Sequence, residues 1–374
     1  MLIEIKALDT LFFRDGKPFT MGENHWTDSL FPPNMSTIYG AIRTAYFMQN
    51  MEVFEKLRMN NELNTEKDPT RKLEIKRLIY RINKGDNSGF YYSMPLDLVA
   101  LKNKSEEEKK QEDKNNKYKV HQLKVKENNY ISSNPLKYLL YFDHQVENIS
   151  DGILNKYQME NYIKGKTEGI EACKISDYLE SEPKIGIGID KELGTSKESR
   201  LYRIDLKRLK DISLIVEFEG IEIYETGLLR LGGEGKYVTY EECSKFEDIS
   251  NPFNVELQSI DNKFKLSLLT PAIFENGWLP KGFNKEDKFI YENEKFKVRL
   301  VAAVVGKHTL IGGYDMAKNR PKPMLKAVPA GATYYFEILD GDVKDIIDQF
   351  QMKSISDFSK KEGYGLGFIS KWGD

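Results

Sequence analysis

Short runs of alternating or β-rich residues recur along this chain and outnumber its segments of helical periodicity. This pattern constrains the fold more than any other feature. The runs are Leu2–Leu8, Phe90–Leu101, Ile212–Phe218, Ile221–Leu229, Phe264–Leu269, Phe296–Val305, Thr333–Leu339 and Gly365–Ile369. Because helical segments alternate with such runs in both halves, the sequence predicts an α+β fold of two small sandwiches, with helices on one face of each sheet.

Two segments have helical spacing. Phe31-Pro32-Pro33 ends regular structure, and a helix is expected after it, with Asn34 or Ser36 as the N-cap. On that helix Ile38, Ile42, Ala45 and Gln49 share one stripe, and Arg43 lies about 140° from Ile38 at 100° per residue. Arg43 is therefore expected to face solvent or a ligand. The second helix is expected at Val343–Phe350.

A length of 374 residues suits two domains. We place their junction near Glu241–Pro252, which gives an N-terminal domain of residues 1–245 and a C-terminal domain of residues 246–374. Two polar stretches, Asn60–Arg71 and Lys102–Lys119, interrupt the first domain as insertions. The second stretch is expected to be mobile, although its mixed charges also permit a short exposed helix.

Apolar runs in the chain stay well short of the roughly 18 residues that a membrane-spanning helix needs. The N-terminus lacks the pattern of a signal peptide, so we expect a cytoplasmic protein without a membrane partner. Cys173 and Cys243 have no CxxC spacing and are expected to be free thiols. The net charge of −2 excludes attraction of the whole molecule to a polyanion, so affinity for RNA requires local clusters of its 56 Lys and Arg residues.

Three glycine-rich loops, Leu231–Lys236, Ile311–Tyr314 and Gly363–Gly367, adjoin strand-like runs. Glycine permits positive φ and lacks a Cβ, so a phosphate or ribose can approach the backbone N–H groups. A tight hairpin without any ligand is the alternative for each loop. The P-loop and Rossmann motifs are absent, which argues against nucleotide hydrolysis.

A basic segment follows the second glycine loop and carries Lys318, Arg320 and Lys322 within five residues. Pro321 and Pro323 exclude it from a helix or a central strand, so an exposed loop is expected. Such cations bind phosphates by counterion release, and Tyr314 can stack on a base. A merely solvated loop is the equal alternative.

The four histidines, His25, His121, His144 and His308, lack the HxxxH or HExxH spacing of a metal site. No metal or other cofactor is therefore expected. His25 lies in a loop and can act as a general base in RNA cleavage, but the sequence places no second acid or base beside it. We expect a non-catalytic protein, and retain an RNA-processing nuclease as the alternative.

Several motifs together resemble a known family. They are Leu8–Phe19, Phe31–Pro33 leading to Ser36–Thr44, Ile185–Asp190, Glu198–Arg203, Leu231–Lys236, and Ile311–Asp315 with Arg320–Pro323. The chain resembles, almost end to end, the subunit of type III-B CRISPR effector complexes that caps the 5′ end of the guide RNA, a member of the repeat-associated mysterious protein (RAMP) superfamily. The two N-terminal motifs are the most specific of the set.

The resemblance implies two ferredoxin-like, RNA-recognition-type domains that hold the repeat-derived 5′ tag of a CRISPR RNA (crRNA). It also implies a non-catalytic subunit with two protein partners, the large polymerase/cyclase-like subunit and the repeating RAMP backbone subunit. Processing of guide RNA by an endoribonuclease of the same superfamily stays the alternative, and a scaffold without RNA contact is a third. The candidate RNA-binding residues are Arg14, Lys17, Ser36, Thr37, Arg43, Gly232, Gly233, Lys236, Gly312, Gly313, Lys318, Arg320 and Lys322.

Overall fold

The computed structural model of the chain describes residues 1–14, 26–103, 115–129, 136–189, 196–243, 251–253, 260, 262–283, 289–315 and 320–373. The chain forms two compact units, each built from three stretches of sequence. Unit 1 contains Met1–Lys76, Tyr178–Cys243 and Leu310–Lys326, and unit 2 contains Arg77–Asp177, Ser244–Thr309 and Ala327–Asp374. The crossing at Cys243–Ser244 lies at the expected junction. However, Arg77–Asp177 groups with the C-terminal stretches, which differs from the expected limits 1–245 and 246–374.

Unit 1 is organised on an antiparallel sheet in the order β16-β17-β1-β15. These strands are β1 (Leu2–Ala7), β15 (Ile212–Glu219), β16 (Thr226–Arg230) and β17 (Tyr237–Glu242). One face carries buried Ile3, Ile5, Leu214 and Val216. Helix α1 (Met35–Gln49) packs against β16 and is followed by α2 (Met51–Met59). The buried face of the sheet and the buried stripe of α1 form the core of this unit.

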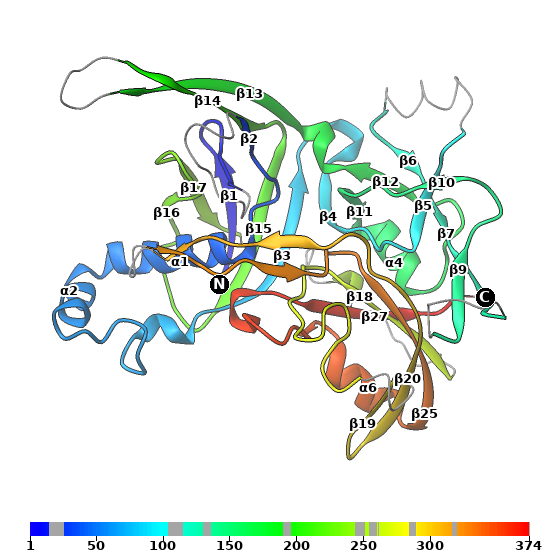
Figure 1. Ribbon diagram of the computed structural model, residues 1–374. Coiled ribbons are helices and arrows are strands. Elements are labelled where there is room, and N and C mark those ends of the chain that lie inside the picture. The colour runs from blue at the N-terminus through cyan, green and yellow to red at the C-terminus, as the bar shows by residue number, and fades with distance from the viewer. Residues whose placement is uncertain are drawn as a thin grey trace. The chain divides into compact units, whose positions relative to one another are not determined.

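Two further antiparallel pairs belong to unit 1. The long ribbon of β13 (Leu179–Ile189) and β14 (Ser196–Leu209) is drawn in green in Figure 1, and β14 also pairs in parallel with β2 (Trp26–Asp28). The second is a hairpin made of two short strand pairs. Strand β22 (Tyr314–Asp315) pairs with β23 (Arg320–Pro321) nearer the turn, and β21 (Thr309–Ile311) pairs with β24 (Leu325–Ala327) at the open end. The hairpin contains the second glycine loop and, from the basic segment, Arg320 and Lys322.

Unit 2 contains two larger sheets. In the first, β3 (Glu74–Ile82) enters from unit 1 and pairs with β4, after which the order is β4-β11-β12-β6. These strands are β4 (Gly89–Ser93), β6 (Tyr118–Lys119), β11 (Gly152–Asn155) and β12 (Glu171–Lys174). The second sheet has the order β19-β20-β25-β18-β27-β26. Its strands are β18 (Lys263–Leu268), β19 (Ile290–Glu292), β20 (Phe296–Val304), β25 (Thr333–Gly341), β26 (Lys353–Ser354) and β27 (Leu366–Lys371).

Helices and small strand pairs complete unit 2. Helix α4 (Lys156–Ile163) packs against β4, β11 and β27, and α6 (Val343–Phe350) packs against β26 and β27. The contact of α4 with β27 explains why Arg77–Asp177 groups with the C-terminal part. The remaining strands are β5 (Leu98–Leu101), β7 (His121–Gln122), β8 (Lys124–Glu127), β9 (Tyr138–Tyr141) and β10 (Val146–Glu147).

The α+β class is confirmed, since helices accompany mostly antiparallel sheets. The description as two ferredoxin-like domains stays a prediction. Two expected strands are corrected. The run Phe90–Leu101 is split into β4 and β5 by a segment that contains Pro95, and Ile221–Leu229 becomes a strand only from Thr226. The second correction has a visible cause, because the Tyr224 N–H donates to the Gln49 side chain instead of a neighbouring strand.

Three expectations concern composition. Cys173 and Cys243 are both free thiols, as predicted. In the portion of the chain that the structure covers, no helix combines the length and apolar character needed to cross a membrane. Of the second polar stretch, residues 104–114 lie outside the described residues, and Tyr118–Lys119 form β6.

Candidate nucleic-acid interface

Every described candidate residue belongs to unit 1, although the candidates come from four separate parts of the sequence. The structure gives a definite set of contacts for the glycine loop after β16, for Arg43, for the start of α1 and for the hairpin. Lys17, Lys318 and the alternative base His25 lie outside the described residues.

The glycine loop at residues 231–236 is packed onto the N-terminal segment that precedes it by more than two hundred residues. The Gly233 N–H donates to the Phe12 carbonyl over 2.8 Å. Gly232 has φ of +85°, and a Cβ there would lie 2.5 Å from the same carbonyl oxygen. These glycines therefore allow two backbone segments to meet. The Gly233 N–H already has an acceptor.

Lys236 at the end of this loop is held by the same N-terminal segment. Its Nζ lies 2.9 Å from Asp9 Oδ2 and 3.0 Å from Thr10 Oγ1. Arg208 on β14 donates from Nη2 to Asp9 Oδ1 over 3.0 Å and also pairs with Glu182. The hydrogen bond from Lys236, followed by one from the Thr10 backbone, lowers the pKa of the Asp9 carboxyl to about 2. Lys236 thus neutralises a carboxylate and fixes the loop.

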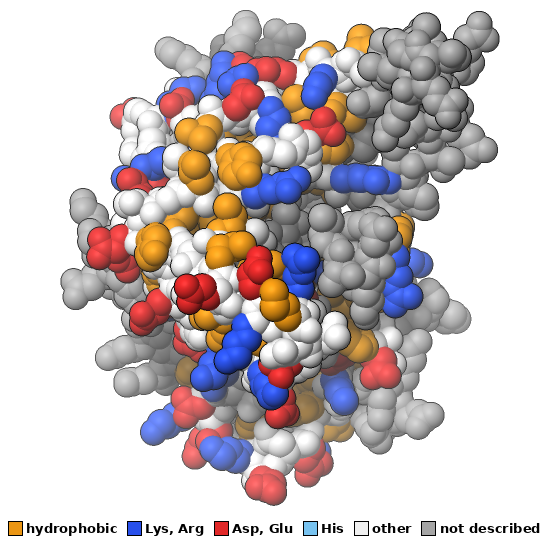
Figure 2. All heavy atoms as spheres, turned by 90° about the vertical axis from the view of Figure 1, so that its left-hand side faces the viewer, with side chains coloured by type: hydrophobic (Ala, Val, Ile, Leu, Met, Phe, Trp, Pro, Cys, Tyr) orange, Lys and Arg blue, Asp and Glu red, His pale blue; other side chains and the backbone are white. Residues whose placement is uncertain are grey.

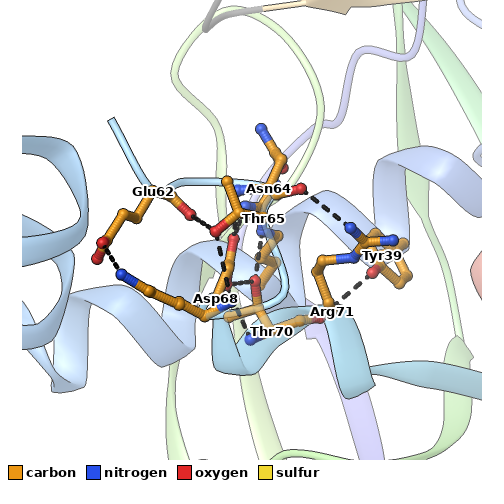
Figure 3. Close-up of polar contacts among 9 residues, drawn as sticks. Tyr39, Glu62, Asn64, Thr65, Asp68, Thr70 and Arg71 are labelled. Atoms are coloured by element: carbon orange, nitrogen blue, oxygen red, sulfur yellow. Dashed lines mark hydrogen bonds and ion pairs between the residues drawn. The ribbon is translucent and has the colours of Figure 1, made fainter. Parts of the chain in front are cut away.

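Arg43 projects from α1 toward the polar stretch at residues 60–71, part of which Figure 3 shows. Its Nη2 lies 2.6 Å from Asp68 Oδ2, and its Nε donates to Thr70 Oγ1 over 2.7 Å. The guanidinium also lies 5.4 Å from the centre of the Phe47 ring. Arg43 does face away from the core stripe, as expected, but its main partner is a carboxylate of the chain itself.

Asp68 is the centre of this loop and is almost fully buried. It accepts hydrogen bonds from the Asn64 N–H and from the N–H and hydroxyl of Thr70. Burial alone would raise the pKa of the Asp68 carboxyl, but the bonds from Thr70 and Asn64 and the charge of Arg43 outweigh it, so the pKa is lowered. The first polar stretch is therefore an ordered loop joined to α1.

Asp9, Asp68 and Arg208, which determine how the candidate cations are held, were not among the residues predicted from the sequence. A local signal existed for Asp68 only. In Asp68-Pro69-Thr70 an acidic residue precedes a proline at the first position of a helical turn, which is typical of an N-cap. Asp9 and Arg208 lie far apart in sequence, and no local pattern pairs them.

The sequence left two alternatives for the N-cap of α1, Asn34 and Ser36, and the structure has Asn34. Asn34 is the N-cap residue, without a side-chain cap bond, and its carbonyl accepts from the N–H groups of Thr37 and Ile38. Ser36 is therefore excluded as the cap, because the helix has already begun at Met35. Ser36 and Thr37 lie half-buried in the first turn, and the Thr37 N–H is already bonded to the Asn34 carbonyl.

The hairpin presents its described cations to solvent. Arg320, Lys322 and Lys326 are all exposed, and the Lys322 N–H donates to the Gly313 carbonyl over 2.9 Å. Gly313 has φ of +148°, and a Cβ there would meet only the Lys322 side chain, at 3.8 Å. Gly312 precedes it and is half-buried. Among the described residues, the backbone at Gly313 is therefore open to the approach of a ligand.

Two other candidate features have structural contacts. Arg14 is exposed and forms an isolated bridge with Ser29, whose hydroxyl accepts from the Phe13 N–H. The third glycine loop lies in unit 2, where a Cβ at Gly365 would lie 2.5 Å from the Ser356 nitrogen. Gly365 also donates its N–H to the Pro271 carbonyl. This loop is packed inside its own unit.

Comparison with known proteins gives a family match along nearly the whole chain. The model of a family described as CRISPR-associated protein (Cas_Cmr3) matches residues 3–372. A search of curated proteins finds no match.

The similar solved structures include two that share low sequence identity with this chain. One is a chain in a type III-B Cmr-beta complex bound to cognate target RNA and AMPPnP, with 16% identity, 93% of this chain and 88% of that chain covered, and a TM-score of 0.49. The other is a chain in a Csm3-Csm4 subcomplex of a type III-A CRISPR-Cas interference complex. It has 14% identity, coverage of 100% and 99%, and a TM-score of 0.35.

Proposed function

The chain belongs to the Cas_Cmr3 family of CRISPR-associated proteins and is thus a type III CRISPR effector subunit, and we propose that it binds the 5′ repeat-derived tag of crRNA in a type III-B complex. The observation that carries this proposal is the family match, which spans residues 3–372 and so includes both units. The proposed subunit is non-catalytic.

The contacts of unit 1 suggest how the RNA-binding work is divided among the candidate residues. Arg43 and Lys236 each hold a carboxylate of the chain, so they shape the surface. Arg320 and Lys322 are exposed on the hairpin, so their positive charges are accessible to RNA phosphates. Gly312 and Gly313 beside them give the RNA backbone room to approach. We propose this hairpin as the principal RNA contact of unit 1.

The proposal includes two protein partners, the large polymerase/cyclase-like subunit and the repeating RAMP backbone subunit. A tag-binding subunit that bridges them places the 5′ end of the guide at a fixed point of the assembly. Specificity for a single-stranded tag would come from its phosphates, 2′-hydroxyls and unstacked bases.

The test is crosslinking within the assembled complex. The chain is co-expressed with the other protein subunits of its effector complex and with crRNA that carries a photoreactive nucleotide in the 5′ tag. We expect adducts on residues 310–326 of this chain, and none there when the photoreactive nucleotide is placed at the 3′ end. Adducts of the tag that map only to other subunits would refute tag binding by this chain.

A further inference from the structure

Strand β16 is the edge of the unit 1 sheet. Strand β17 pairs with one of its sides, and among the described residues no strand pairs with the other. The Glu242 N–H donates to the Glu225 carbonyl, and the Leu231 N–H donates to the Lys236 carbonyl. Hydrogen-bonded positions alternate along an antiparallel pair. The backbone groups of Gly227 and Leu229 therefore point toward β17, and those of Thr226, Leu228 and Arg230 point toward the outer side.

The outer edge of β16 is longer than the other edges of the two largest sheets among the described residues. In unit 2 the edge strands β6 and β26 have two residues each and β19 has three, whereas β16 has five. Short edge strands are one of the ways in which proteins avoid unwanted pairing. Charged or proline residues along the edge are another, and β16 (Thr-Gly-Leu-Leu-Arg) has only Arg230 at its end.

The edge is also apolar on its exposed face. Leu228 is 56% exposed, and the register places Tyr237, 45% exposed, on the same face of β17. Next to the strand, exposed Tyr224 donates its N–H to Gln49 at the end of α1. Figure 2, in which the left-hand side of Figure 1 faces the viewer, shows hydrophobic side chains among scattered charges. Exposed apolar side chains on an edge strand are suited to contact with another protein.

We infer that the outer edge of β16 binds an extended segment of a neighbouring protein subunit, which pairs with it as an added strand. This inference rests on the proposed function, because it assigns one surface to the assembly of the effector complex. The backbone groups at Thr226, Leu228 and Arg230 supply the hydrogen bonds of strand addition, and Leu228 supplies an apolar contact for alternate side chains. Exposed Glu222 and Glu225, which precede the strand in sequence, favour a basic residue in the part of the segment near them.

A second copy of this chain fits the edge less well than a different subunit. Pairing over five residues covers only a fraction of the roughly 1,200 Å² that a stable, independent interface buries. A strand addition of this size is sufficient where other contacts already hold the partner in a multi-subunit complex. The edge therefore suits one part of a larger interface.

The experiment is hydrogen–deuterium exchange of residues 225–231 in the full chain. Exchange is compared in the isolated chain, in the isolated chain with crRNA, and in the complex assembled by co-expression with the other protein subunits. We expect the amides of Thr226, Leu228 and Arg230 to exchange at least tenfold more slowly in the complex, and those of Gly227 and Leu229 to be already slow in the isolated chain.

A variant isolates the backbone contribution. Leu228→Pro removes an outward N–H together with the leucine side chain, at a position where edge strands tolerate proline, whereas Leu228→Ala removes the side chain and keeps that N–H. We expect Leu228→Pro to weaken assembly at least tenfold, and Leu228→Ala to weaken it less. If Leu228→Pro misfolds, the hydrogen–deuterium exchange of the wild-type chain still tests the inference.

Three results would overturn the inference. They are unchanged exchange in a complex that retains both the chain and crRNA, protection produced by crRNA alone, and protection in the isolated chain that grows with its concentration. The first indicates that the partner docks elsewhere, the second that RNA covers the edge, and the third that a second copy does. Failure of the chain to enter the complex at all would overturn the proposed function as well.

Discussion

Lys265 Nζ lies 3.2 Å from Asp97 Oδ2 in the core of unit 2, and both side chains are completely buried. The carboxylate also accepts from the hydroxyls of Tyr162 and Tyr335, over 2.8 and 2.7 Å. The ammonium lies 3.9 Å from the centre of the Tyr162 ring. Burial lowers the pKa of Lys265, opposed by the charge of Asp97. This cluster joins the segment before β5 to the central strand β18 of the second sheet.

The first prediction concerns this buried pair. Lys265→Met leaves the Asp97 charge buried without its cation, so unfolding in urea should show a loss of about 3–5 kcal/mol. Lys297→Met on β20 is the matched control, because Lys297 pairs with Glu292 at the surface, where such pairs contribute about 0–1 kcal/mol. Equal losses for the two variants would show that the buried pair has no special role.

The second prediction concerns Arg43. Arg43→Met removes a cation and one hydrogen bond from the buried Asp68 carboxylate and a second hydrogen bond from Thr70 Oγ1, and should cost about 1–3 kcal/mol of unfolding free energy. Arg58→Met on the exposed face of α2 should cost less than about 0.5 kcal/mol. If Arg43→Met left stability unchanged and weakened only the binding of crRNA, then Arg43 would be a direct RNA contact.

Local periodicity was sufficient for much of the fold. It placed a helix at Val343–Phe350, which are the bounds of α6, and a helix after Pro33, which is α1. It also placed Arg43 on the outer side of α1. Residues three or four positions apart determine these features, so a short window of sequence contains them.

The candidate site depended on contacts that no short window contains. Arg43 meets Asp68 across 25 residues, Lys236 meets Asp9 across 227, and Lys265 meets Asp97 across 168. The alternation around Lys265 is typical of a strand with one polar face turned to solvent. Because other segments cover both faces of β18, that polar face became the inside of unit 2 instead.

The third prediction tests the glycine loop as a packing device. Gly232→Ala places a Cβ 2.5 Å from the Phe12 carbonyl oxygen at positive φ, so it should cost about 2–4 kcal/mol. Gly235→Ala is the matched control, because Gly235 also has positive φ but nothing lies within 4 Å of its Cβ position. That variant should cost only the backbone strain, about 1 kcal/mol. Similar costs, measured by thermal unfolding, would mean that close packing at Gly232 does not matter.

The fourth prediction is a pH dependence at Asp9. The pKa of this carboxyl is lowered from 3.8 to about 2, first by the hydrogen bond from Lys236. A carboxyl with a lowered folded-state pKa stabilises the folded chain fully above pH 3.8, and this contribution is lost as the pH falls toward 2. A carbon-detected NMR titration should show the low pKa in the wild type and a return toward 3.8 in Lys236→Met. Lys184→Met, which breaks the pair with Glu234 in the same loop, should leave Asp9 unchanged.

The fifth prediction concerns the exposed cations of the hairpin. Arg320→Ala combined with Lys322→Ala should weaken binding of tag-bearing crRNA and should flatten its salt dependence. Each lost phosphate contact lowers the slope of log K against log salt by about 0.7 for a single strand. The pair Lys281→Ala and Lys344→Ala removes the same charge from exposed positions in unit 2, and should leave the slope unchanged. The measurement is fluorescence anisotropy of labelled RNA over a salt series with the full chain.

Two outcomes would contradict this prediction. A slope that falls equally in both double variants would show that net charge, rather than the hairpin, governs RNA binding. An unchanged slope in the hairpin variant would remove Arg320 and Lys322 from the interface.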